Sequence, residues 1–408
     1  MQIKRIWFVS HYSMPPEYEM RIKTQMYAHF LGQMGIECII FAASTIHNTD
    51  INLIQGKEKY IERQYDDLKF VHIRCSGYTK TDLKRIVNME QFAYRFNRIA
   101  EKFEPPDVIV ADTYCVSYKP IYKYCKRHHI PFVVDVRDLW PQSIVEYMHI
   151  NETNPVIRMM YKMEKNMYTN ADRIIFSFDG GYDYIQDRHL ENQVPRGKVF
   201  FINNGVNLEE FRCNCEKYRI ADEDLDNTEF FKVVYVGSIR KVNNLGLLLD
   251  VAKKVKNQKI RFLIWGAGEE LDELKKRVVE EKIGNVTFKG FVEKKYVASI
   301  TERADLNLIH NNPSELFKYG ISFNKLFDYL ASGQATLSTF PCKYNPAVYE
   351  GAGVDVNNST PEEIAKAIDE ISEKDLARFR ENAREAAEKY DYKALTLRLL
   401  DILKNINK

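Results

Sequence analysis

Two charged side chains, Lys325 and Asp328, lie three positions apart in a largely apolar stretch. On an α-helix this spacing places both on one face, with Cβ atoms about 5–6 Å apart. A cation in the first turn opposes the helix dipole, so the lysine makes more sense if an anion binds the free N–H groups there. Asp328 would then accept hydrogen bonds from sugar hydroxyls attached to that anion. A solvated Lys–Asp pair is the alternative, and this stretch alone does not decide.

A second phosphate-compatible group follows a predicted strand at 232–236. Its residues are Gly237, Ser238, Arg240 and Lys241, and they precede an apolar helix. Arginine and lysine near a helix N-terminus suit phosphate oxygens. A charged surface loop would look similar, but Lys325 in the same half of the chain favours phosphate binding. Ser322 is the expected N-cap of the helix at 323–332, and Gly333 its left-handed C-terminal residue.

Two polar groups follow strands in the first half of the chain. A long loop after the strand at 5–10 carries His11, Glu17 and Arg21, which we expect to face a ligand. The strand at 131–138 ends in an acid- and arginine-rich sequence that continues to Trp140. Asp135 and Arg137 share one face of this strand, so an Arg–Asp pair that closes the strand end is the structural alternative.

Two motifs are rejected. The G-x-G at 266–268 lacks a third glycine, and Glu269 and Glu270 would repel a pyrophosphate, so no dinucleotide cofactor is expected. The D-x-D strings at 222–226 lie in an acidic linker, where solvated charge is the better interpretation than a metal site.

The elements that position these residues alternate short apolar strands with amphipathic helices, twice along the chain. This rhythm predicts an α/β protein with two Rossmann-like domains facing across a cleft. We place the first domain at 1–205 and the second at 206–389, with a C-terminal helix in 390–408 crossing back to the first. Residues 206–227 are expected to be irregular. The expected strands lie at 5–10, 37–44, 69–74, 107–112, 131–138, 173–178, 198–203, 232–236, 261–265, 286–289, 305–310, 335–340 and 353–356.

Composition limits the function further. The net charge of +2 gives no nucleic-acid signature, and no apolar run suggests a signal peptide or a membrane span. Seven irregularly spaced cysteines indicate a reduced, cytoplasmic protein without a zinc site. Basic and aromatic residues cluster at 80–98 and 119–127, which suggests contact with the anionic inner face of a membrane. Aromatic core packing with solvated charges is at least as good an explanation.

Seven motifs in order resemble the retaining family-4 glycosyltransferases of the two-Rossmann GT-B fold. They are Pro15-Pro16-Glu17, Val136-Arg137-Asp138-Leu139-Trp140-Pro141, Ala171-Asp172-Arg173-Ile174-Ile175, Asn203-Asn204-Gly205-Val206-Asn207, Tyr235-Val236-Gly237-Ser238-Ile239, Gly290-Phe291-Val292 and the stretch from Asn324 to Gly333. The motif sequences at 137–141 and 324–331 most resemble those of the bacterial capsule and O-antigen branch of this family, which includes N-acetylfucosaminyltransferases.

The resemblance implies a donor site in the second domain and an acceptor site in the first. Asp328 would hold the donor ribose, and the loop with Phe291 and Val292 would receive the base. The family's usual diphosphate-binding Arg and Lys align with Ser238 and Asn243. Arg240, Lys241 and Lys325 would therefore supply the charge, with Ser322 and Asn324 beside them and no metal.

On the acceptor side, the resemblance and the clusters together give Asp138, His11 and Glu17 as catalytic candidates. Arg21, Arg137 and Trp140 are the candidate acceptor contacts. The expected reaction moves a sugar, such as N-acetylfucosamine, from a UDP-sugar to a lipid-linked or saccharide acceptor in surface polysaccharide synthesis. A nonhydrolysing sugar-nucleotide epimerase and a non-catalytic nucleotide-sugar-binding assembly protein are the alternatives.

Overall fold

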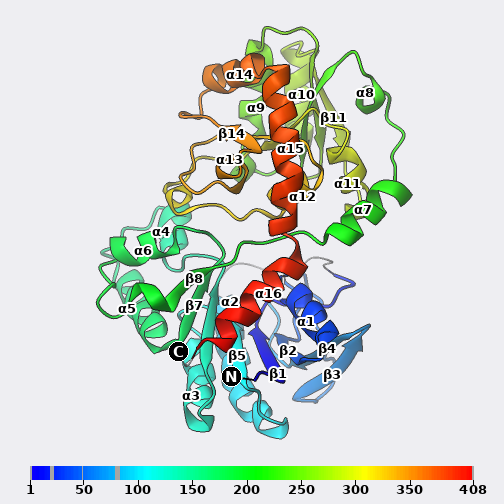
Figure 1. The fold of residues 1–408 in the computed structure, drawn as a ribbon. Coiled ribbons are helices and arrows are strands. Elements are labelled where there is room, and N and C mark those ends of the chain that lie inside the picture. The colour runs from blue at the N-terminus through cyan, green and yellow to red at the C-terminus, as the bar shows by residue number, and fades with distance from the viewer. Residues whose placement is uncertain (1, 19–22, 48, 79–82, 407–408) are drawn as a thin grey trace. The chain divides into compact units, whose positions relative to one another are not determined.

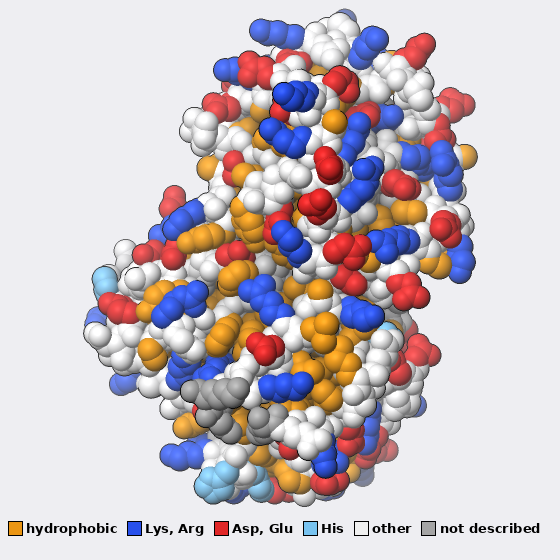
Figure 2. Space-filling model, viewed as in Figure 1, with side chains coloured by type: hydrophobic (Ala, Val, Ile, Leu, Met, Phe, Trp, Pro, Cys, Tyr) orange, Lys and Arg blue, Asp and Glu red, His pale blue; other side chains and the backbone are white. Residues whose placement is uncertain are grey.

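The structure is a computed structural model that describes residues 2–18, 23–47, 49–78 and 83–406. The chain divides into two compact units (Figure 1). Unit 1 comprises residues 1–203 and 392–408, and unit 2 comprises residues 204–391. Each unit is a largely parallel sheet with helices against it, which confirms the predicted α/β fold with two Rossmann-like halves. Acidic and basic side chains are interspersed over the face seen in Figure 2, as the near-balanced charge implies.

Unit 1 contains an eight-stranded sheet within its described residues, in the order β3-β4-β2-β1-β5-β6-β7-β8. All neighbours are parallel except β3 and β4. The antiparallel edge strand β3 was not predicted, because its polar sequence lacks the apolar run of a buried strand. The strands are β1 (Arg5–Ser10), β2 (Glu37–Ala43), β3 (Tyr60–Tyr65), β4 (Leu68–Ile73), β5 (Val108–Asp112), β6 (Phe132–Val136), β7 (Arg173–Phe176) and β8 (Val199–Phe201).

Helices pack on both faces of this sheet because alternate residues of β1 point to opposite sides. Ile6 and Phe8 join a core with residues of α1 and α16, whereas Trp7 stacks on Tyr124 of α3. The C-terminal helix α16 is thus part of unit 1, as the predicted fold requires. The helices are α1 (Lys23–Gln33), α2 (Leu83–Ile99), α3 (Tyr118–His128), α4 (Gln142–Met148), α5 (Pro155–Asn170), α6 (Gly181–Asp187) and α16 (Tyr392–Lys404).

Unit 2 contains a six-stranded parallel sheet in the order β11-β10-β9-β12-β13-β14. Its strands are β9 (Phe231–Val236), β10 (Ile260–Trp265), β11 (Val286–Gly290), β12 (Leu306–Ile309), β13 (Ala335–Ser338) and β14 (Gly353–Asp355). Its helices are α7 (Leu208–Lys217), α8 (Glu223–Asp226), α9 (Leu245–Lys254), α10 (Leu271–Glu280), α11 (Lys294–Thr301), α12 (Asn324–Ala331), α13 (Pro346–Tyr349), α14 (Pro361–Glu370) and α15 (Glu373–Lys389).

Two local expectations were wrong. The segment at 206–227 is not irregular throughout, because Asn207 and Asp222 cap helices α7 and α8 by accepting backbone hydrogen bonds. The N-cap of α12 is Phe323 rather than Ser322, and no side chain caps this helix. The left-handed Gly333 after α12 is confirmed, with φ of 67°.

None of the helices in the described ranges is both long and apolar enough to cross a bilayer.

Candidate functional site

The Lys325 side chain lies at the carboxyl edge of the unit 2 sheet, in a position that only a glycine at 237 permits. Its Nζ is 4.2 Å from the centroid of the Tyr235 ring. A Cβ on Gly237 would lie 2.6 Å from the same Nζ. Helix α12 is held against β9 by the Tyr329 hydroxyl, which accepts a hydrogen bond from the Val236 N–H at 3.3 Å. The ammonium is therefore fixed beside the end of β9.

The charge of Lys325 has no carboxylate partner among the described residues. Burial lowers the pKa of Lys325 to about 8. His310 follows β12 and is neutral at pH 7, since burial lowers its pKa to about 4. Its ring is hydrogen-bonded to Thr339 Oγ1 and the Asn244 carbonyl. A cation that has lost part of its hydration is strongly stabilised by a nearby anion, which replaces the interactions lost with water. This site therefore suits a bound anion.

Asp328 lies one turn further along α12 and is buried, with Oδ2 4.0 Å from Lys294 Nζ. The N–H groups of the first turn of α12 receive no side-chain cap. Uncapped N–H groups, an ammonium and a carboxylate are thus grouped at one helix end, which can bind a phosphate and an adjoining hydroxylated group.

Ser322 and Asn324 are held by Asn204, which lies at the start of unit 2. The Asn204 N–H donates to Ser322 Oγ at 2.7 Å, and Asn204 Nδ2 donates to Ser322 O at 2.6 Å and to Asn324 Oδ1 at 2.9 Å. These contacts position the segment before α12. Both polar side chains therefore have partners within unit 2, and their predicted ligand contacts stay a prediction.

The loop after β9 leaves its two cations exposed. Ser238 Oγ donates to Asn243 Oδ1 at 2.9 Å, which orders the loop, while Arg240 and Lys241 point their charges to solvent. Neither cation has a carboxylate partner in the part of the chain that the structure describes. Both cations can bind outer phosphate groups of a ligand whose first phosphate lies at Lys325. Neither of them contacts Lys325 itself.

The G-x-G at 266–268 serves packing against this loop. A Cβ on Gly266, where φ is 153°, would lie 1.8 Å from Gly237 O, and one on Gly268 would lie 2.0 Å from Ile239 O. The Ile239 N–H donates to the Ala267 carbonyl at 2.9 Å. Only glycine allows this backbone approach.

The D-x-D acids are paired rather than solvated. Lys289 Nζ lies 2.8 Å from Asp222 and 2.7 Å from Asp224. Asp222 also caps α8. Lys289 thus compensates one of their two negative charges within unit 2. The nearby Phe291 is 76% exposed, and Val292 packs against the cluster around Trp265.

Unit 1 has its own charged group at the carboxyl edge of its sheet, and here the charges are paired. Arg137 Nε lies 3.2 Å from Asp135 Oδ2 and 3.3 Å from Asp112 Oδ2, and its Nη2 donates to Thr24 Oγ1. Lys23 Nζ lies 3.4 Å from Asp135 Oδ1. Arg137 directly follows β6, and its pairing with Asp135 closes the strand end, which was the structural alternative to a ligand role for these residues.

Asp138 and Trp140 extend from this edge into an aromatic cluster. Asp138 is exposed and accepts a hydrogen bond from the Tyr114 hydroxyl at 3.4 Å. The Trp140 ring lies 4.5 Å from the Tyr114 ring. The Arg85 guanidinium lies 5.6 Å from Trp140, and its Nε donates to Tyr12 Oη at 2.6 Å. Arg85 was not predicted as a site residue, because its basic sequence context resembled a solvated surface.

His11 is buried beside this cluster and is neutral at pH 7. Burial lowers its pKa to about 4, its Nε2 is hydrogen-bonded to Asn88, and its Nδ1 has no partner among the described residues. Glu17 is exposed, and none of the described hydrogen bonds or ion pairs joins it to His11. Arg21 lies outside the described residues.

Comparisons with known proteins agree on one class. The family described as "Glycosyl transferases group 1" matches residues 217–390, and "Glycosyltransferase Family 4" matches residues 25–210. The probable glycosyltransferase WbjE of Pseudomonas aeruginosa is 22% identical over 258 residues, which cover 60% of this chain and 61% of that protein. The chain thus spans about three fifths of that curated relative.

Solved structures share the fold over the whole chain. Sucrose-phosphate synthase of Thermosynechococcus elongatus has a TM-score of 0.72 at 17% identity and covers 99% of both chains. Anabaena HepE in complex with UDP and glucose has a TM-score of 0.64 at 14% identity, covering 99% of this chain and 100% of that one. With both halves matched by glycosyltransferase families and the sheets arranged as in those structures, the chain belongs to the glycosyltransferases of the GT-B fold.

Proposed function

We propose that this protein transfers a sugar from a UDP-linked donor bound by unit 2 to a saccharide or lipid-linked acceptor bound by unit 1. The observation that carries the proposal is Lys325, a half-buried cation that lacks a carboxylate and lies beside uncapped helix N–H groups. A donor diphosphate supplies the missing negative charge. The Anabaena structure with UDP and glucose, which shares this fold, supports the choice of UDP.

Transition-state stabilisation is the main task of the donor site. As the bond between the anomeric carbon and the diphosphate oxygen breaks, its electrons pass to the leaving oxygen. Lys325 and the N–H groups of α12 are positioned before the reaction to stabilise that charge, with Arg240 and Lys241 reaching the outer phosphate. Asp328 accepts hydrogen bonds from the ribose hydroxyls, and Phe291 and Val292 flank the base. These cations provide the charge without a metal, while the D-x-D acids are occupied by Lys289.

On the acceptor side, an acceptor hydroxyl oxygen forms the new bond to the anomeric carbon, and its proton passes to an oxygen of the leaving diphosphate. Asp138 is the exposed carboxylate of unit 1 best suited to bind that hydroxyl. His11 is neutral at pH 7, and its ring packs edge-on against the Tyr12 ring. Trp140 offers a flat apolar face to a sugar ring. Arg137 acts as a positioning residue, whereas Glu17 and Arg21 would contact the acceptor from the loop after β1.

The finer assignment follows the resemblance of residues 137–141 and 324–331 to the capsule and O-antigen branch. It comprises retention of configuration at the anomeric carbon, an N-acetylated deoxysugar such as N-acetylfucosamine, and a role in bacterial surface polysaccharide synthesis at the inner face of the membrane. Phe92 and Phe96 do not support the membrane contact, because both are buried in the core of unit 1.

The test compares Lys325→Ala with Lys275→Ala, which removes an exposed lysine of unit 2. We expect Lys325→Ala to weaken UDP binding and to lower kcat/KM by about 100-fold or more. Loss of a single hydrogen-bond donor directed at the charge that develops in the transition state has an effect of this size. Titration with UDP, GDP, ADP, dTDP and CMP, followed by assays with UDP-sugars, measures both. Normal turnover by Lys325→Ala would contradict the phosphate role. Conversion of the UDP-sugar to its epimer without an acceptor would instead identify an epimerase, and binding without turnover an assembly protein.

A further inference from the structure

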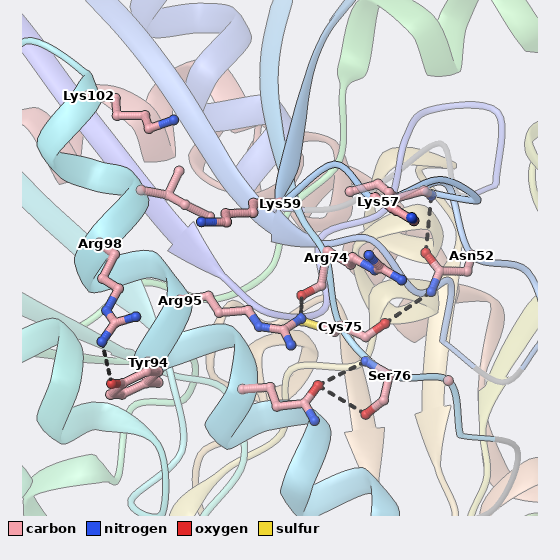
Figure 3. A pocket seen from close by; sticks show the side chains of 14 residues that line it. Asn52, Lys57, Lys59, Arg74, Cys75, Ser76, Tyr94, Arg95, Arg98 and Lys102 are labelled. Carbon is pink, nitrogen blue, oxygen red and sulfur yellow. Dashed lines mark hydrogen bonds between the residues drawn. The ribbon is translucent and has the colours of Figure 1, made fainter.

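A cavity of about 970 Å³ lies in unit 1, and its lining includes none of the residues proposed for catalysis. Helix α2 and the segment just after it form one wall, and the segments before β3 and after β4 form the other (Figure 3). Its lining contains six cations, which are Lys57, Lys59, Arg74, Arg95, Arg98 and Lys102. Among the residues that the structure describes, no carboxylate lines it.

These six cations also lack carboxylate partners anywhere in the described ranges. Some basic residues of unit 1 are paired, as Arg5 is with Glu37 and Glu104 and Arg127 with Glu101, whereas others, including lysines of α3, have no carboxylate partner among the described residues. What distinguishes the cavity is that six such unpaired cations surround one space. Like charges grouped around one space repel each other, and a bound anion removes that repulsion.

The guanidinium groups of the α2 wall are already oriented. Arg95 donates one N–H to the Arg74 carbonyl, and Arg98 donates one to the Tyr94 hydroxyl at 2.8 Å with its guanidinium 5.0 Å from that ring. Lys102 Nζ lies 4.9 Å from the Tyr60 ring. Figure 3 shows these side chains on the opposite wall from Lys57 and Arg74. Each arginine keeps further N–H groups for a ligand.

The wall after β4 is equally ordered. Ser76 Oγ donates to Gln91 Oε1 of α2 at 3.0 Å, and Asn52 Nδ2 donates to the Cys75 carbonyl at 3.0 Å. The Ser76 carbonyl also accepts a hydrogen bond from Asn88, the residue that holds His11. One side chain thus connects the cavity wall to the proposed acceptor side.

We propose that this cavity binds a ligand that carries two or more phosphate groups. Arginine recognises phosphate oxygens through paired N–H groups, and three arginines with three lysines exceed what a single phosphate needs. The Tyr94 ring at the wall provides a surface for the part of the ligand next to the phosphates. The phosphates belong either to a diphosphate-linked acceptor, an identification that rests on the proposed function, or to lipid headgroups.

The test is a calorimetric titration of the full chain with inorganic pyrophosphate, with UMP present in saturating amount to fill the donor site. UMP carries a single phosphate, so it does not compete for a cavity that takes two or more. The cavity variants are Arg95→Gln/Arg98→Gln and, from the opposite wall, Lys57→Gln/Lys59→Gln. The matched control is Lys119→Gln/Lys123→Gln, which makes the same charge change on the exposed face of α3. We expect pyrophosphate affinity to fall at least tenfold in both cavity variants and to stay within twofold in the control, with UDP binding retained in all three.

Two results would overturn the proposal. One is the absence of pyrophosphate binding by the UMP-saturated protein, and the other is an equal loss of affinity in the α3 control. An error in the proposed donor site would give a different result. In that case Lys325→Ala would bind UDP as tightly as the wild type, and the pyrophosphate affinities of the cavity variants would be the same as expected above.

A vesicle experiment separates the two sources of phosphate. If pyrophosphate releases the protein from phosphatidylglycerol vesicles and the cavity variants no longer bind them, the cavity takes lipid headgroups. If vesicle binding is equal in the wild type and the cavity variants, the cavity takes the diphosphate of a soluble or acceptor ligand.

Discussion

Two lysines whose pKa is lowered by burial, one of them fully and one half buried, show how the same residue type serves structure in one unit and ligand binding in the other. Lys23 of unit 1 lies near Asp135 and donates to Ser177 Oγ at 3.1 Å and to the Ile202 carbonyl at 2.6 Å. Lys325 of unit 2 has a tyrosine ring and a glycine beside it, and no carboxylate among the described residues. Burial lowers the pKa of both. The difference lies in the partners, so a buried cation that its own fold leaves unpaired indicates a ligand.

The pair Lys23→Met and Lys325→Met gives the sharpest contrast. Removing Lys23 leaves Asp135 with less compensation, so we expect the free energy of unfolding to fall by about 3–5 kcal/mol. Removing Lys325 relieves a desolvated charge, so stability should be unchanged or slightly higher while UDP affinity is lost. Urea unfolding and UDP titration of both variants measure this. Equal destabilisation by the two substitutions would remove the distinction.

Gly237→Ala tests whether the position of Lys325 matters beyond its charge. The added Cβ would lie 2.6 Å from Nζ and must push the ammonium aside. We expect UDP affinity to fall by about tenfold, or about 1.4 kcal/mol, because the charge remains but is displaced. Gly284→Ala is the control, since a Cβ there meets no atom within 4 Å. A normal dissociation constant for Gly237→Ala would mean that the ligand does not use Lys325 where the structure places it.

The smallest expected effect is the pH dependence of UDP binding. Lys325 is charged below its pKa of about 8 and loses its proton above it, so affinity is full near pH 7 and falls as pH rises. We expect the dissociation constant to rise about twofold at pH 8 and about fourfold at pH 8.5. Arginine stays charged throughout this range, so Lys325→Arg should bind UDP with no such slope. A slope shared by wild type and Lys325→Arg would assign the titration to another group.

Much of the fold followed from local patterns. The alternation of apolar strands and amphipathic helices predicted both α/β units, because a parallel strand buried on two faces must be apolar along its length. The same rule missed β3, whose polar residues belong to an exposed antiparallel edge. It also missed α7 and α8, where acidic composition concealed two capped helices.

The candidate site was predictable in part. The spacing of Lys325 and Asp328 on one helix is a property of the sequence, and so is the glycine after β9. The contact between Gly266 and Gly237 O, and the pairing of Lys289 with the D-x-D acids, join residues far apart in the chain. No local pattern predicts such contacts.

The sequence by itself determined the two α/β halves, the family and the residues available for phosphate binding. Only the tertiary structure decided which cations lack a partner. It paired Arg137 with Asp112 and Asp135, left Lys325 without a carboxylate among the described residues, and gathered six cations around one cavity. The physical reason is that periodicity depends on neighbours along the chain, whereas desolvation and charge pairing depend on neighbours in space.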